Sequence, residues 1–248
     1  MYIALVELDV FSGVSIFLPG TSLSAPVYPL PPPTTVVGAL SYPYMRQFSK
    51  ENEGSYSASV KLLDYIMYAV AGARGYVITR DTERIYQIIY QRKQRWRSEE
   101  FKGLWYTVAP RGIVKYEDDI LYLLYISNKR DILNYCYGIT RVGRKESPVV
   151  VRKVVIRSIN EVVEPSLNNF ETIFYTHSSI AECDGISMPL PALARENYGS
   201  RVKPVMEEFY IPRDLGSMTC RVKSEGVLVK IENFHIAIPR NIISYVAR

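Results

Sequence analysis

The sequence has 248 residues, of which 48% are apolar and 22% are charged, a balance that excludes a largely disordered chain. This length is enough for one large domain or two modest ones, each with its own core. The formal net charge of +5 is compatible with a polyanionic partner, although the distribution of the charges says more than their sum.

The first predicted element is a buried strand at residues 2–9. A proline-rich connection follows over residues 26–33, because the fixed φ of proline favours extended structure. Thr34 or Thr35 is then predicted to cap a helix, which Pro43 interrupts or restarts as the first residue of a second piece.

The next predicted elements are a helix and two strands. Residues 59–71 fit a helix, because five apolar residues recur there at helical spacing. These are Leu62, Leu63, Ile66, Met67 and Val70. Residues 76–79 and 85–90 are predicted to be strands.

A basic and aromatic segment follows at residues 91–115, which hold seven positive and two negative charges. Lying between predicted strands, it indicates a hairpin insertion at about residues 88–118. Single-stranded nucleic acid is bound by basic tracks with aromatic residues on which bases stack. The candidate RNA contacts here are Arg92, Lys93, Arg95, Trp96, Arg97 and Lys102. The alternative is a solvated surface hairpin whose aromatic residues pack against the body or a neighbouring subunit.

Residues 120–126 predict a strongly apolar, central strand, and residues 128–140 predict a helix. A strand at residues 149–156 is predicted after the turn that Pro148 ends. The resulting order, with the hairpin inserted, is that of a ferredoxin-like or RRM-like β-α-β-β-α-β unit.

The turn between that helix and strand reads R-V-G-R-K-E-S and contains Arg141, Gly143, Arg144 and Lys145. A glycine turn lets the backbone approach a ligand, while basic side chains supply charge to a phosphate. The alternative is an ordinary helix C-cap at Gly143 with solvated basic neighbours.

The remaining residues, 158–248, predict a small β-rich domain. Its expected strands are at residues 170–175, 207–211, 219–222, 227–231 and 235–238. The predicted fold class is therefore α+β: a ferredoxin-like domain at residues 1–157 with a projecting hairpin, and a second domain at residues 158–248.

The cysteines and histidines predict no disulfide framework, zinc ribbon, metal site or cofactor. Cys136, Cys183 and Cys220 are widely spaced and odd in number, and His177 and His235 have no neighbours at metal-ligand spacing. The N-terminus lacks the pattern of a signal peptide, and no apolar run is long enough to span a bilayer. A soluble, cytoplasmic protein without membrane contact is expected.

Residues 28–40 read Y-P-L-P-P-P-T-T-V-V-G-A-L. A helix that begins just after a proline turn offers free N–H groups to an anion, although most such turns are only turns. With the N-terminal strand, this run resembles the CRISPR-associated "Cas five" family of the RAMP superfamily of RRM-like proteins. The R-V-G-R-K-E-S turn is similar to that family's glycine-containing loop. The resemblance spans residues 1–156, and the overall length is similar to archaeal subtype I-A members.

This resemblance implies a non-catalytic subunit of an antiviral ribonucleoprotein. Family members bind the 5′ handle of CRISPR RNA at one end of a Cascade-type complex, and contact its backbone subunit and its large subunit. By position, residues 91–115 would be the RNA-separating hairpin called the thumb, with residues 141–147 as the glycine loop. Thr34 and Thr35 would lie beside that loop, and Tyr44 and Arg46 complete the candidate RNA-binding set.

Three alternatives remain open. One subtype of the family is a metal-independent endoribonuclease that cuts repeat RNA, for which a general base would be sought among Tyr44, His177 and their neighbours. Another alternative is the equivalent subunit of a type III effector complex. The last is an unrelated protein-interaction module without RNA affinity.

Overall fold

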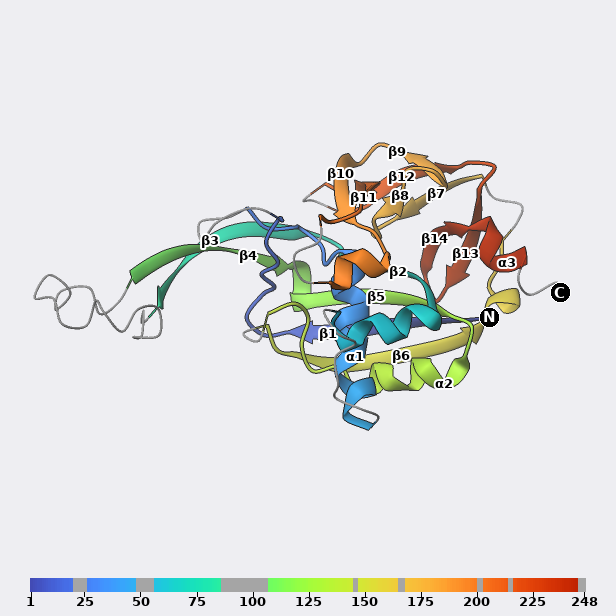
Figure 1. Cartoon of the computed structure of the whole chain (residues 1–248). Coiled ribbons are helices and arrows are strands. Elements are labelled where there is room, and N and C mark those ends of the chain that lie inside the picture. Colours follow the sequence, from blue (N-terminus) through green and yellow to red (C-terminus); the bar gives the residue numbers. More distant parts are fainter. Residues whose placement is uncertain are drawn as a thin grey trace, which may run out of the picture.

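The centre of the fold is a four-stranded antiparallel sheet in the order β2-β5-β1-β6 (Figure 1). Its strands are β1 (Tyr2–Val10), β2 (Ile66–Gly72), β5 (Ile120–Ser127) and β6 (Val149–Ser158). The computed structural model describes residues 1–19, 26–47, 56–85, 107–144, 147–164, 168–199, 203–213 and 216–244. The predicted α+β class is confirmed.

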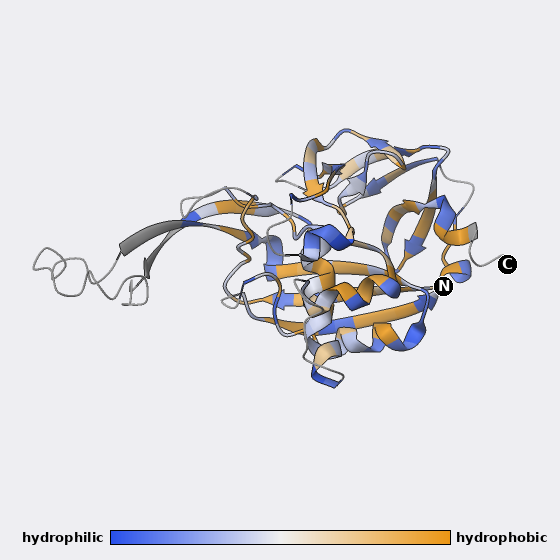
Figure 2. Ribbon diagram, viewed as in Figure 1, coloured by the Kyte–Doolittle hydropathy of each residue, from blue (hydrophilic) through white to orange (hydrophobic). Residues whose placement is uncertain are grey.

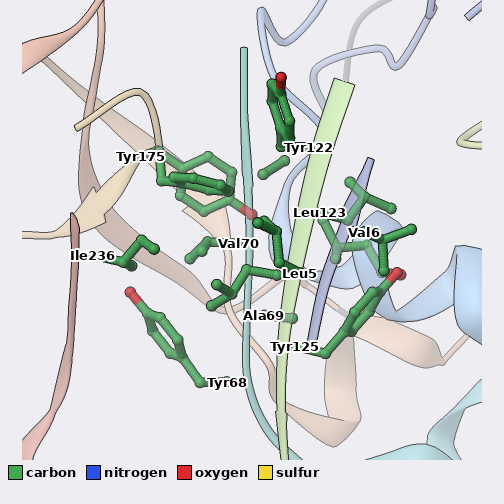
Figure 3. Packing of buried hydrophobic residues seen from close by; sticks show 14 of the residues in the cluster. Leu5, Val6, Tyr68, Ala69, Val70, Tyr122, Leu123, Tyr125, Tyr175 and Ile236 are labelled. Carbon is green, nitrogen blue, oxygen red and sulfur yellow. The ribbon is translucent and has the colours of Figure 1, made fainter. Parts of the chain in front are cut away.

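Strand β5 is buried on both faces, which explains its continuous apolar sequence. Tyr125 points toward helix α1 (Pro33–Gln47), where its hydroxyl donates a 2.8 Å hydrogen bond to the Val36 carbonyl. Tyr122, three residues earlier, faces the other side, because side chains alternate along a strand. There it packs against the C-terminal half, with its ring centroid 4.8 Å from that of Phe234. Figure 3 shows this core from close by.

Helix α1 differs in two respects from the prediction. It begins at Pro33, and the N–H groups of Thr35 and Val36 both donate to the Pro32 carbonyl. Thr34 and Thr35 therefore lie inside the first turn and do not cap it, since proline is well suited to the first helical position. The helix also runs through Pro43 without interruption.

The predicted helix at residues 59–71 is wrong. The chain instead forms a short 3-10 helix, η1 (Ala58–Asp64), and then strand β2. Strand β2 is buried on both faces except at Met67, so it lacks the alternation that marks a half-buried strand. A doubly buried strand and an amphipathic helix are not distinguished by apolar content alone.

The predicted helix at residues 128–140 is shorter and tighter than expected. Only α2 (Arg130–Leu133) is α-helical, and η5 (Asn134–Gly138) continues it as a 3-10 helix. A Cβ atom at Gly138 would lie 2.7 Å from Cβ of Pro43 in α1. This position therefore requires glycine because two helical segments approach closely there.

A two-stranded ribbon of β3 (Tyr76–Ile85) and β4 (Thr107–Tyr116) extends away from the body (Figure 1). The ribbon begins at Tyr76, earlier in the chain than the insertion predicted at about residues 88–118, whereas β4 lies within the predicted range. The segment after β1 joins the base of the ribbon, where Val14 and Val114 exchange hydrogen bonds of 2.9 and 2.8 Å. A short 3-10 turn, η4 (Glu117–Asp119), connects β4 to β5.

The C-terminal half is rich in strands, as predicted, and packs on the face of the main sheet opposite α1. Two three-stranded sheets, β10-β11-β8 and β7-β12-β9, stand beside the hairpin β13-β14. The bounds are β7 (Asn169–Thr172), β8 (Thr176–His177), β9 (Ala181–Cys183), β10 (Ile186–Pro191), β11 (Met206–Ile211), β12 (Met218–Val222), β13 (Gly226–Ile231), β14 (Phe234–Pro239) and helix α3 (Arg240–Ser244), with 3-10 turns η6 (Ile159–Glu161) and η7 (Arg195–Tyr198).

The buried residues of both halves form one continuous apolar cluster. Figure 2 shows hydrophobic residues concentrated in the strands of the main sheet and in β13 and β14. Phe174 links the halves, with its ring 6.5 Å from Tyr122 and 5.7 Å from Phe234. The backbone N–H of Tyr175 also donates to Ala71 in β2.

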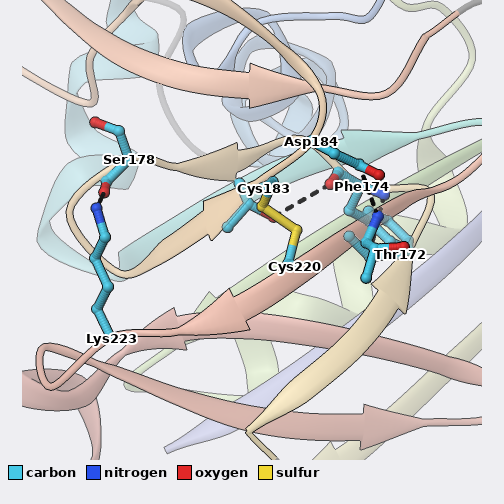
Figure 4. Close-up of a disulfide and its surroundings, with 9 residues drawn as sticks. Thr172, Phe174, Ser178, Cys183, Asp184, Cys220 and Lys223 are labelled. Carbon is cyan, nitrogen blue, oxygen red and sulfur yellow. Dashed lines mark hydrogen bonds between the residues drawn. A yellow bond between two sulfur atoms is a disulfide. The ribbon is translucent and has the colours of Figure 1, made fainter.

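One prediction about the cysteines is wrong, because Cys183 and Cys220 form a disulfide (Figure 4). The two residues face each other across β9 and β12, with Cα atoms 4.1 Å apart. Their separation of 37 residues hides this pairing in the sequence. Cys136 is a free, buried thiol.

Among the residues that the structure describes, no group of histidine, cysteine and carboxylate side chains is arranged to hold a metal ion. None of the described helices is long and apolar enough to cross a bilayer.

Candidate RNA interface

The turn at residues 141–144 packs tightly against the segment that follows β1. Arg141 pairs with Pro148 at the base of the turn, and the Val142 N–H donates to the Ser147 carbonyl. Gly143 has a φ of +79°, and a Cβ atom there would lie 2.8 Å from Cγ1 of Ile16. Glycine is therefore required for both backbone conformation and space.

The same segment connects this turn to the base of the ribbon. The Ser15 hydroxyl donates a 2.8 Å bond to the carbonyl of Gly112 in β4, next to the Val14–Val114 pairing. Two features predicted separately, the glycine loop and the hairpin, therefore meet at residues 14–17.

Beside the turn at residues 141–144, three arginine guanidiniums lie over two aromatic rings. The Arg144 guanidinium lies 3.8 Å from the centroid of the Phe17 ring. The Tyr42 ring has Arg141 at 4.9 Å and Arg46 at 5.9 Å. Tyr42 and Arg46 are one helical turn apart on α1, so they share a face. We call these five residues the arginine–aromatic cluster.

In the described part of the chain, none of the three arginines forms an ion pair with a carboxylate. Arg152 on β6 is different, because it binds both Glu7 at 3.3 Å and Asp9 at 2.6 Å. Like charges that gather without neutralisation create a positive potential that favours an anionic ligand. Among the described residues, the cluster is therefore a locally positive surface.

The other predicted RNA contacts lie away from this cluster or outside the residues that the structure describes. Tyr44 faces a second aromatic group, with ring centroids 5.3 Å from Tyr135 and 6.5 Å from Tyr65, and burial raises its pKa. Thr34 and Thr35, both half-buried, are at the opposite end of α1 from Arg46, about 18 Å away at 1.5 Å per residue. Seven predicted contacts lie outside the described residues: Arg92, Lys93, Arg95, Trp96, Arg97, Lys102 and Lys145.

Sequence reasoning missed both aromatic members of the cluster. Tyr42 had a local signal, because it precedes Arg46 by four residues in a predicted helix. Phe17 had none, since its contact with Arg144 exists only in the folded chain.

No protein-family model matches the chain, but individual relatives do. "CRISPR system aCascade subunit Cas5 1" of Saccharolobus solfataricus is 30% identical over 161 residues. The alignment covers 63% of this chain and 66% of that relative, just under two thirds of its length. "CRISPR-associated protein Cas5 2" of the same organism is 27% identical over 225 residues, covering 85% of this chain and 82% of the relative.

A solved structure agrees on the fold. The crystal structure of a CRISPR protein from Archaeoglobus fulgidus matches with a TM-score of 0.65 and 15% identity, covering 96% of this chain and all of that one. The chain thus shares the α+β fold of that protein. Its sequence similarity to the Saccharolobus solfataricus proteins shows that it belongs to the Cas5 family.

Proposed function

We propose that this protein is a non-catalytic, CRISPR RNA-binding subunit of a Cascade-type complex of subtype I-A, which holds the 5′ handle of the RNA. The observation that carries the proposal is the arginine–aromatic cluster, where Arg46, Arg141 and Arg144 converge without carboxylate partners in the described chain. Arginine is suited to this role because its planar fork matches the oxygens of a phosphate.

The topology supports a ferredoxin-like, RRM-like core for this subunit. The strand order β2-β5-β1-β6 is antiparallel, with α1 between β1 and β2 and α2 between β5 and β6. This is the order of a β-α-β-β-α-β unit, into which the ribbon β3–β4 is inserted between its two middle strands. We assign the ribbon as the thumb.

The backbone and large subunits of the complex are the proposed protein partners. Val77 and Ile78 on β3 support this, since they are 62% and 50% exposed at the base of the ribbon. Adjacent residues on a strand point to opposite faces, so both faces of the ribbon offer apolar surface there. Large contiguous apolar patches mark surfaces that a partner covers, and we propose that each of these two side chains belongs to such a surface in the complex.

The test is retention and cleavage of a labelled CRISPR repeat RNA by the purified chain in EDTA. The wild type is expected to retain the RNA without cutting it. Arg141→Gln with Arg144→Gln should weaken retention, and should lower the slope of log affinity against log salt by about 0.7 for each lost phosphate contact on single-stranded RNA. Arg157→Gln is the matched control, because Arg157 is an exposed arginine on β6 outside the cluster. An unchanged slope in the double variant would remove the cluster from the interface.

Endoribonuclease activity is a second candidate that one observation favours. The Ser179 hydroxyl lies 2.7 Å from Nδ1 of His177, and Nε2 lies 3.4 Å from a Glu207 oxygen. The Ser179 backbone N–H also donates to Nδ1 at 3.1 Å, so the lone pair of that nitrogen is already occupied. His177 would become a base only after that bond breaks. A discrete cut in EDTA that His177→Ala abolishes would establish this activity instead.

The equivalent subunit of a type III complex is a variant of the same proposal. It predicts the same RNA retention. The two are separated by which purified partner subunits, type I or type III, assemble with the chain on RNA.

A further inference from the structure

The geometry of the arginine–aromatic cluster shows more than positive charge. The guanidinium of Arg144 lies 3.8 Å from the centroid of the Phe17 ring, within stacking distance. The contact brings together a turn after η5 and the segment after β1, and close packing of Gly143 on Ile16 fixes the turn there.

Tyr42 holds its two arginines from two different elements. Arg46 comes from the same helix, and Arg141 comes from the turn. Tyr42 is 39% exposed, so part of this residue lies at the surface, where a ligand can reach it. Phe17 is likewise only partly buried.

A ring beneath a guanidinium limits the directions in which its N–H groups point. Arginine offers five donors in one plane, and a free arginine must lose rotamer freedom before two of them meet a phosphate. An aromatic ring that orients the plane beforehand lowers this cost, since preorganisation raises affinity without a new contact. Cation–π attraction supplies the restraint.

We infer that Phe17 and Tyr42 are positioning residues, which hold the guanidiniums of Arg144 and of Arg141 and Arg46 so that two N–H donors of each meet the oxygens of an RNA phosphodiester. This inference rests on the proposed function and deepens it. The site recognises the geometry of the phosphate through guanidinium groups of fixed orientation. A positive charge without that orientation does not replace them.

The experiment compares Phe17→Leu with Phe11→Leu, using the full-length chain and a labelled single-stranded repeat RNA. Phe11 is 67% exposed and is not part of the cluster, so it is a matched control. We expect Phe17→Leu to weaken retention about three- to fivefold with the salt slope unchanged, because the charge remains while its orientation is lost. Phe17→Trp should restore wild-type affinity, since it also offers a flat ring.

Arg144→Lys separates orientation from charge. It keeps the positive charge but removes the fork, so affinity should fall about tenfold at an unchanged salt slope. The double variant Phe17→Leu with Arg144→Lys should bind no more weakly than Arg144→Lys alone. If the fold-losses of RNA affinity of the two single variants multiply in the double variant, Phe17 does not act through Arg144. That result would overturn the inference.

A spectroscopic readout tests the positioning directly. In the wild-type protein the ring current of Phe17 should shift the Arg144 Nε–H resonance upfield, and Phe17→Leu should remove that shift while circular dichroism stays unchanged. If the wild type retains no RNA, the proposed function fails and the inference falls with it. If the wild type retains RNA and Phe17→Leu binds like Phe11→Leu, only the inference fails.

Discussion

Gly143 lies against Ile16, so closely that a Cβ atom on the glycine would be 2.8 Å from Cγ1 of the isoleucine. This contact places the arginine-bearing turn on the segment that also braces the base of the ribbon through Ser15 and Gly112. The spatial relation between the two proposed RNA-binding features therefore depends on one residue without a side chain.

Replacing Gly143 with alanine should destabilise the protein and weaken RNA binding. The residue has a φ of +79°, where an L-residue costs about 1–2 kcal/mol, and the new methyl group would displace Ile16. We expect the free energy of unfolding in urea to fall by about 2 kcal/mol, and RNA retention to fall at a temperature where the variant is folded.

Gly38→Ala is the matched control for that change. Gly38 lies inside α1, and a Cβ atom there would meet nothing within 4 Å. The same substitution should therefore stabilise the protein, by about 0.5–1 kcal/mol, because alanine is a better helix former. Unchanged stability in Gly143→Ala would contradict the close packing on Ile16, and a loss of stability in Gly38→Ala would contradict the open space described there.

The number of thiols that react with Ellman's reagent should depend on whether the protein is unfolded and whether it is reduced. Cys183 and Cys220 are paired, and burial raises the pKa of Cys136 well above its ordinary value, so the folded protein should not react with Ellman's reagent at pH 8. Unfolding without reductant should expose one thiol, and unfolding after reduction should expose three. Two or more reactive thiols in the unreduced chain would contradict the disulfide.

Reduction of the disulfide should lower the stability of the C-terminal strands. Closing a loop of this separation contributes up to about 4 kcal/mol in the chain-entropy model. We expect the melting temperature to fall on reduction, and Cys183→Ser with Cys220→Ser to match the reduced wild type. A double variant that still responds to reductant would point to another cause.

The protein should lose stability steeply at alkaline pH. Burial raises the pKa of Tyr28 to about 12, and burial also raises the pKa values of Tyr68, Tyr125 and Tyr175. Above pH 10 the unfolded chain releases tyrosine protons that the folded chain keeps, so the free energy of unfolding falls as pH rises. Each such tyrosine contributes about 1.4 kcal/mol per pH unit until its folded pKa is reached.

Urea titrations at pH 9, 10 and 11 measure this effect. Tyr28→Phe removes one contributing group, so its decline between pH 10 and 11 should be shallower than that of the wild type. Equal declines would show that Tyr28 does not retain its proton in the folded protein.

The two halves should unfold together. Phe174 is fully buried and packs on Tyr122 of β5 and Phe234 of β14, so Phe174→Ala should cost about 3–5 kcal/mol. Hydrogen exchange should accelerate in peptides of β5 as well as in those of β7 and β14. Loss of protection only within residues 158–248 would instead support the predicted division after residue 157 as two independent folding units.

Local sequence patterns were sufficient to predict those helices and strands whose own residues identify them. The apolar run of β5, the valine-rich β6 and the C-terminal strands β7 and β11 to β14 follow from composition and turn residues, and the proline run preceded α1 as expected. The strands β8, β9 and β10 were not predicted, and β10 contains Pro189 and Pro191, which are typical of a loop. They were insufficient at β2, whose two buried faces remove the alternation that identifies a strand. At η5 the chain approaches Pro43 closely at Gly138, and the helical pattern of residues 128–140 does not encode this contact.

In the candidate site, too, some features are visible in the sequence and others exist only in the folded chain. The basic turn with its glycine and the arginine on α1 can be recognised in the sequence, because charge and glycine content are local properties. The contacts of Arg144 with Phe17, of Arg141 and Arg46 with Tyr42, and of Cys183 with Cys220 arise only in the folded chain. Those partners come from distant segments, and sheet register and close packing, which no local pattern encodes, bring them together.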